Sequence, residues 1–131
     1  MAITGNRAPA PSVRTTLFID AGFEFAVGAA LIAFAGTIGG WFGFGPPIAV
    51  AIGLVFVLAG VVILQMARSP VDSALVRALA SANIAGGALG WLTLAVVWGS
   101  LAPEARWLLG MASDAVILIG LLELLALRRA A

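Results

Sequence analysis

Four long apolar runs, separated by short stretches rich in Gly, Pro and charged residues, dominate the hydrophobic pattern of this chain. Each run is close to the roughly 20 residues that an α-helix needs to cross the hydrocarbon core of a bilayer. The pattern therefore predicts an all-α fold, an up-down bundle of four membrane-spanning helices. We expect these helices over about residues 16–38, 48–67, 71–98 and 103–128.

Turn signals fall between the predicted helices. "GGWFGFGPP", residues 39–47, is rich in Gly and Pro and predicts a turn. In "RSPVDS" we expect Ser69 as the N-cap, Pro70 at the first helical position and Asp72 at the third. Pro103 should open the last helix in the same way, with Glu104 in its first turn.

Residues 1–14 lack apolar periodicity, and Pro9 and Pro11 disfavour a helix there. We predict a flexible cytoplasmic tail before a four-helix transmembrane domain over residues 15–131. A cleaved signal peptide is the alternative for this end, but Asp20 and Glu24 would interrupt its apolar core.

The composition indicates that lipid rather than water surrounds the protein. The chain is 63% apolar and only 10% charged, with a mean hydropathy of +1.15, and so few charges could not cover a soluble domain of this size.

A net charge of +1 argues against nucleic-acid binding. Without Cys or His, the usual ligands of zinc and the parts of a Ser-His-Asp triad are missing. Met66 and Met111 fall at opposite membrane faces, so they cannot share a haem iron. We predict no metal and no cofactor, with a lipophilic ligand as the alternative.

The arginines predict the orientation. Six of them flank the helix ends that face one side, and Arg106, offset by Glu104, lies on the other. By the positive-inside rule both termini should face the cytoplasm. An aromatic belt at the outer boundary agrees with this topology; it consists of Trp41, Trp98 and Trp107.

Several polar residues fall inside the predicted spans, where a charge is costly unless it is paired, solvated or neutralised. At about 1.5 Å per residue, one layer near the inner boundary should hold Asp20, Arg77 and Glu123. A second layer, nearer the midplane, should hold Glu24 and Asn83. We expect these two residues to share a hydrogen bond, with Glu24 neutral. The cluster is either a clasp that sets helix register or a site for a proton or cation.

Arg77 has two alternatives, since it can extend to the inner headgroups or neutralise Asp20 or Glu123. Asp114 lies alone in the outer half of the membrane. It is nine residues from Glu123 and so on the opposite face of the last helix. We therefore expect Asp114 to meet a lateral surface, a cavity or a partner chain, unless Ser113 or Thr93 satisfies it.

Small residues let helices approach closely in lipid. The third predicted helix carries Gly86, Gly87 and Gly90. They favour packing within the bundle; a homodimer seam is the alternative.

Several short motifs together resemble a known family. They are "LFIDAGFE", "GFGPP", "ARSP", "ALASANIAGGA" and "LLELLALRR". In this order they resemble a family of small bacterial four-helix integral membrane proteins, loosely similar to DoxX-like proteins, for which no activity is settled. The resemblance covers nearly the whole chain and rests on single residues in apolar runs. It implies that Asp20, Asn83 and Glu123 are family positions. Gly86, in place of a bulky aromatic, and the additional Glu24 and Asp114 depart from that pattern.

Three functions fit these observations. The first is a non-enzymatic membrane module, an accessory or assembly subunit of an inner-membrane complex. The second is a small dimeric proton-coupled transporter. The third is a binder of a lipophilic ligand such as a quinone or pigment. We rank them in this order, because a carboxyl group on the outer half of the last helix suggests contact with a partner chain. The expected partners are therefore the lipid bilayer and either a second copy or a larger membrane complex.

Overall fold

A computed structural model describes residues 11–131, and within this range all the regular secondary structure is helical, without strands. Four helices are long and apolar enough to cross a membrane, so the fold is that of a multi-pass membrane protein. The elements are α1 (Val13–Ala33), α2 (Ala35–Phe42), α3 (Pro46–Arg68), α4 (Ser73–Val97), the short 3-10 helix η1 (Trp98–Ser100) and α5 (Pro103–Ala130).

The helix starts follow local sequence chemistry, with two corrections. The predicted tail lies outside the described residues as far as residue 10, but Val13 and Arg14 already belong to α1. Asp72, not Ser69, is the N-cap of α4, because its carboxylate accepts from the backbone N–H groups of Ala74 and Leu75. Pro103 opens α5 as expected.

The first predicted span is wrong at its end. We expected one helix over residues 16–38 and a turn over residues 39–47, but α1 ends at Ala33 and the separate helix α2 follows after Phe34. Gly43 terminates α2 in the left-handed conformation, with a φ of 78°. The Phe44 N–H bonds the Gly39 carbonyl at 2.9 Å, which completes a Schellman-type stop.

The long helices form two pairs, α1 with α3 and α4 with α5. Glycines make the first pair close, because a Cβ on Gly28 would come within 2.7 Å of the Gly53 carbonyl oxygen. In the second pair, Gly87 and Gly90 lie directly against Ser113 of α5, whereas a Cβ on Gly86 would meet nothing within 4 Å. Two of the three predicted packing glycines are therefore packed within the bundle, and Gly86 is not.

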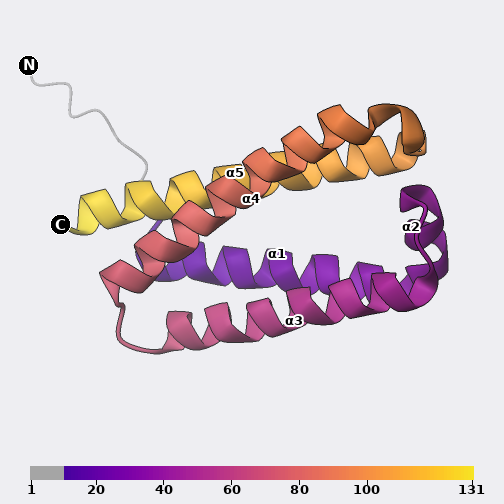
Figure 1. The fold of residues 1–131 in the computed structure, drawn as a ribbon. Coiled ribbons are helices and arrows are strands. Elements are labelled where there is room, and N and C mark those ends of the chain that lie inside the picture. The colour runs from indigo at the N-terminus through magenta and orange to yellow at the C-terminus, as the bar shows by residue number, and fades with distance from the viewer. Residues whose placement is uncertain (1–10) are drawn as a thin grey trace, which may run out of the picture.

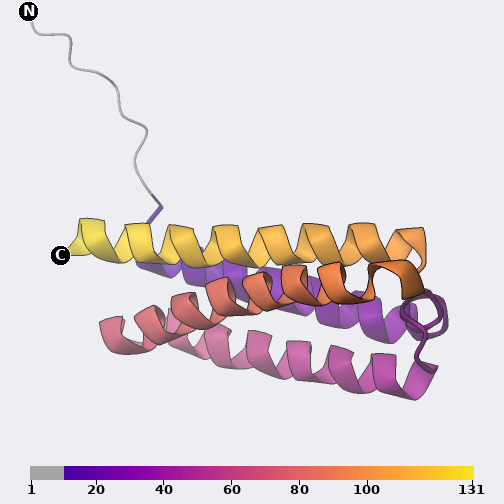
Figure 2. The ribbon, with the colours of Figure 1, turned by 45° about the horizontal axis from the view of Figure 1, so that its top comes forward.

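The two pairs meet at both ends of the bundle. At the terminal end, where α1 begins and α5 finishes (Figures 1 and 2), residues from all four long helices share an apolar core. At the opposite end, which we call the α2 end, α2 packs on the turn between α4 and α5, and the Ala102 N–H bonds the Trp41 carbonyl at 3.2 Å. Nothing in the sequence near Phe34 requires the break before α2. The packing of Trp41 and Phe42 against this turn supplies a tertiary reason for it.

The outside of the bundle is apolar and its interior carries acids. Large apolar side chains such as Val55, Leu58 and Val96 are 65%, 65% and 77% exposed, while Asp20 and Glu123 are completely buried. Such a surface suits contact with lipid rather than water.

Arginine and tryptophan separate along the bundle axis. The described arginines other than Arg106 lie near the terminal end, because α1, α3, α4 and α5 all begin or finish there. Trp41, Trp98 and Trp107 belong to α2, η1 and the first turns of α5, at the α2 end. The predicted belt is therefore gathered at one end, and the direction in which this end faces stays a prediction.

Candidate functional site

Three helices bring acids and one amide together inside the bundle. Asn83 on α4 donates through Nδ2 to Oδ2 of Asp20 on α1 at 2.9 Å, and to Oε2 of Glu123 on α5 at 3.4 Å. The second contact is longer and weaker than the first. Together with Glu24, one turn further along α1, these residues form what we call the polar layer.

Acceptors outnumber donors in the polar layer. Asp20 Oδ1 and Glu123 Oε1 are buried without a hydrogen-bond partner when both groups are counted as carboxylates. The same Asn83 nitrogen contacts both carboxyl groups, and a hydrogen bond between two carboxyl groups would require a proton on one of them. The Asn83 amide is the N–H donor that the described residues bring to these acids.

The predicted hydrogen bond between Glu24 and Asn83 is wrong. Asn83 bonds Asp20 and Glu123 instead, which places it in the layer expected for those two acids. The depth count assumed parallel helices, but α4 runs obliquely to α1 and α5 (Figure 1). A tilted helix advances less than 1.5 Å per residue along the bundle axis, so Asn83 is nearer the terminal end than the count gave.

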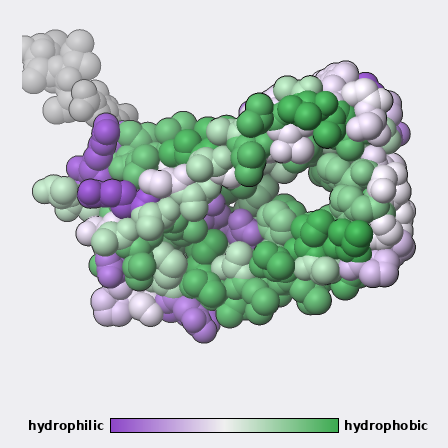
Figure 3. Space-filling view, viewed as in Figure 1, coloured by the Kyte–Doolittle hydropathy of each residue, from purple (hydrophilic) through white to green (hydrophobic). Residues whose placement is uncertain are grey.

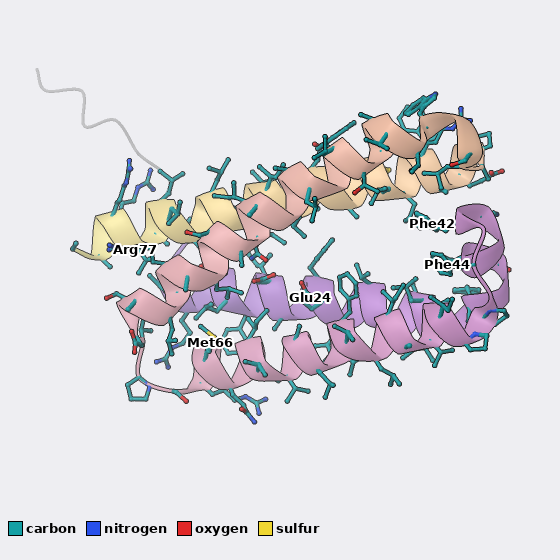
Figure 4. The ribbon with its side chains drawn as sticks, in the orientation of Figure 1. Glu24, Phe42, Phe44, Met66 and Arg77 are labelled. Atoms are coloured by element: carbon teal, nitrogen blue, oxygen red, sulfur yellow. The ribbon has the colours of Figure 1, made fainter. Side chains whose placement is uncertain are left out.

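Arg77 does not join the polar layer. Its side chain is exposed, and within residues 11–131 no acidic group lies within 4 Å of it. Figure 4 shows Arg77 near the terminal end of the bundle, apart from Glu24. Of the two alternatives, the structure therefore supports extension toward the surface, and the acids lack a cationic neighbour from the described residues.

An apolar cavity opens beside the polar layer, between the two helix pairs. Its volume is about 480 Å³, within the range of roughly 300–1,000 Å³ that small-molecule pockets occupy. We call it the groove. In the space-filling view it coincides with an opening near the α2 end, with a largely apolar rim (Figure 3). Its lining is wholly apolar: Phe23, Ala26, Val27, Ala30, Leu31, Ile38, Phe42, Phe44, Ile52, Phe56, Leu108, Leu109 and Ala112.

Glu24 is next to the lining of this groove on α1, although it is not itself a lining residue. It lies three residues before Val27, a lining residue, and therefore on nearly the same face of α1. Its side chain is 8% exposed and makes no hydrogen bond to the described residues. In Figure 4, Glu24 lies on the side of α1 that faces the space between the helix pairs. Phe42 and Phe44, stacked at 5.6 Å, also line the groove.

Asp114 lies apart from the polar layer, on the outer face of α5. Its side chain is exposed, as its opposition to Glu123 predicted, and it accepts a hydrogen bond of 2.9 Å from Nε1 of Trp91 on α4. Neither Ser113 nor Thr93 is its partner: the Ser113 hydroxyl donates to the Leu109 carbonyl instead. The outward carboxyl group is thus satisfied within the chain.

A shallow depression surrounds this pair toward the α2 end. Trp98 and Trp107 line it, and the guanidinium of Arg106 lies 4.9 Å from the centre of the Trp98 ring. The same guanidinium donates to the Leu101 carbonyl at 3.1 Å. These contacts fasten the turn between α4 and α5.

The groove is the feature that the linear pattern missed. Its walls come from α1, α2, α3 and α5, and each contributes only ordinary apolar residues. The sequence signal was indirect: phenylalanines at residues 42, 44 and 56 recur around the first loop. Trp91 as the partner of Asp114 was also missed, although an indole N–H is a natural donor to a carboxyl group at this depth.

Metal binding has no support in the geometry, because residues 11–131 hold no group of three or more His, Cys, Asp or Glu side chains arranged to bind an ion. Comparisons with known proteins add no assignment. No protein-family model, no curated protein and no solved structure matches this chain.

Proposed function

We propose that this chain is a non-enzymatic, multi-pass membrane module that binds one lipophilic molecule in the groove between its two helix pairs. The observation that carries the proposal is the groove itself, an apolar cavity of about 480 Å³. Glu24, a buried acid, is one residue from Phe23 and three from Val27 of its lining, and no cationic side chain of residues 11–131 forms a salt bridge with it. Apolar walls with a few polar groups at one end are typical of small-molecule sites. The arginine distribution and the resemblance to small bacterial membrane proteins support a place in a bacterial inner membrane, with both termini in the cytoplasm.

The groove changes the ranking that the sequence suggested. An accessory subunit came first because Asp114 pointed outward without a partner, but Trp91 supplies that partner. A proton-coupled transporter needs a route through both membrane faces, whereas the terminal end is packed with an apolar core that includes Leu17 and Ile63. An accessory role stays a second proposal, and a stable hetero-complex in the measurement below would favour it.

Native mass spectrometry from a mild detergent tests ligand binding directly. We expect the wild-type chain to retain a non-protein mass that detergent does not account for. Ala30→Phe and Ala112→Phe each fill the groove, from α1 and from α5 respectively, and should lose that mass. Ala85→Phe, at an exposed position of α4 outside the groove, is the matched control and should keep it.

The thermal unfolding of all four proteins shows whether a variant has lost its ligand or its fold. Two groove variants are used so that the test still works if one of them does not fold. A wild-type chain that retains no extra mass, or folded groove variants that retain as much as Ala85→Phe, would overturn the proposal.

A further inference from the structure

The chemistry of the polar layer restricts what its occupant can be. The polar layer holds three carboxyl groups, from Asp20, Glu24 and Glu123, and one amide donor, Asn83, which bonds Asp20 and Glu123. Carboxylates accept hydrogen bonds and do not donate them, so a molecule that completes this layer must bring donors of its own.

No basic side chain of residues 11–131 forms a salt bridge with these acids. The first residues of α4 carry the exposed Arg77, and α3 contributes only the exposed Arg68 at its last residue. Within residues 11–131 no salt bridge reaches Asp20, Glu24 or Glu123.

Glu24 is the group best placed to meet a ligand. It is more than nine-tenths buried, it lacks a hydrogen-bond partner among the described residues, and on α1 it lies between Phe23 and Val27, which line the groove. Asp20 and Glu123 lie behind it and already share Asn83. A ligand whose apolar body fills the groove would therefore place its polar end against Glu24 first.

We infer that the ligand is an amphiphilic cation, an apolar body with one ammonium or similar N–H-bearing cationic group that pairs with Glu24. This inference rests on the proposed function and adds the class of ligand. The ammonium group supplies the two things that the polar layer lacks, which are hydrogen-bond donors and positive charge. Charge-assisted hydrogen bonds of this kind are stronger than neutral ones. An ammonium group paired with an ionised Glu24 leaves the pair without net charge.

Three probes with the same alkyl chain separate these contributions. Dodecylammonium carries charge and N–H donors, dodecyltrimethylammonium carries charge without donors, and dodecanol carries a donor without charge. We expect native mass titrations to show the tightest binding for dodecylammonium. Glu24→Gln should weaken that binding by roughly 10- to 100-fold, as expected for the loss of a hydrogen bond to a charged group. Asp114→Asn, which changes an acid outside the groove, is the control and should leave it unchanged.

The outcomes separate the two proposals. Binding that Ala30→Phe abolishes, but that is equal for all three probes and unchanged in Glu24→Gln, keeps the groove and overturns the cationic ligand. Equal binding of dodecylammonium and dodecyltrimethylammonium also overturns it, because N–H donors would then contribute nothing. Failure of every probe to bind in a groove-dependent way overturns the cationic ligand, whereas the groove itself is overturned only if the wild-type chain also retains no groove-dependent mass. Preference for dodecylammonium that is lost in folded Glu24→Gln and kept in Asp114→Asn supports the inference.

Discussion

The side-chain amide of Asn83 on α4 donates a 2.9 Å hydrogen bond to Asp20, which is 63 residues earlier on α1. The bond joins one helix pair to the other beside the groove. Because the same nitrogen also reaches Glu123, one side chain links an acid of the first helix pair to an acid of the second.

Asn83→Leu should destabilise the bundle by about 0.6–2 kcal/mol, since hydrogen bonds between membrane helices are modest in strength. The substitution removes the amide from between Asp20 and Glu123. Unfolding in detergent with increasing SDS measures the change. Ser81→Ala is the control, because the Ser81 hydroxyl bonds only the Arg77 carbonyl of its own helix. Equal losses for both variants would contradict a role for Asn83 in joining the pairs.

Gly86 and Gly87 are neighbours in sequence with opposite surroundings, so alanine substitution should separate them. A Cβ at position 87 would come within 2.6 Å of the Ser113 carbonyl oxygen, and α4 would have to move away from α5. We expect Gly87→Ala to cost about 1–3 kcal/mol, as overpacking does. Gly86→Ala meets nothing within 4 Å and should be neutral or slightly stabilising. The same SDS titration checks both, and a loss at Gly86 would point to an interface between copies instead.

Asp114→Asn should leave the stability of the chain nearly unchanged. The amide oxygen of Asn can still accept the hydrogen bond from the Trp91 indole. Asp114→Leu removes the acceptor and should cost about 0.6–2 kcal/mol. Thermal unfolding of the two variants tests this. A clear loss in Asp114→Asn, with a change in the native mass of the assembly, would show that the charge itself meets a partner chain.

Reporter fusions test the orientation of the bundle in the membrane. A reporter after Ala131 should be active in the cytoplasm, because the arginines lie near the terminal end. A reporter inserted after Gly43, in the loop between α2 and α3, should be active outside. Reversed signals from the two positions would overturn the predicted topology.

Local chemistry allowed the four spans to be predicted from sequence. Long apolar runs can only be buried in lipid or in a large core. Prolines mark helix starts because the first turn of a helix does not use the backbone N–H that proline lacks. Pro103 begins α5 as predicted, and the opposition of Asp114 and Glu123 follows from helical geometry alone.

Which polar groups touch could not be predicted in the same way. Counting residues along each helix predicted that Asn83 would bond Glu24. In the structure α4 runs obliquely, and Asn83 bonds Asp20 instead. The break at Phe34 and the helix α2 depend on packing against a turn some 60 residues later in the chain. Crossing angles and such long-range contacts arise from the fit of whole helix surfaces, which periodicity within one helix does not contain.

By itself, then, the sequence determined the solvent of this protein, its four crossings and the acids inside them, because these follow from hydrophobicity and helix length. The tertiary structure alone decided that the helices form two pairs, held apart over part of their length, and that the acids gather beside the groove. The physical reason is that close packing at Gly28 and Gly87 draws helices together within each pair. Between the pairs, larger side chains such as Phe23 and Phe56 line the groove.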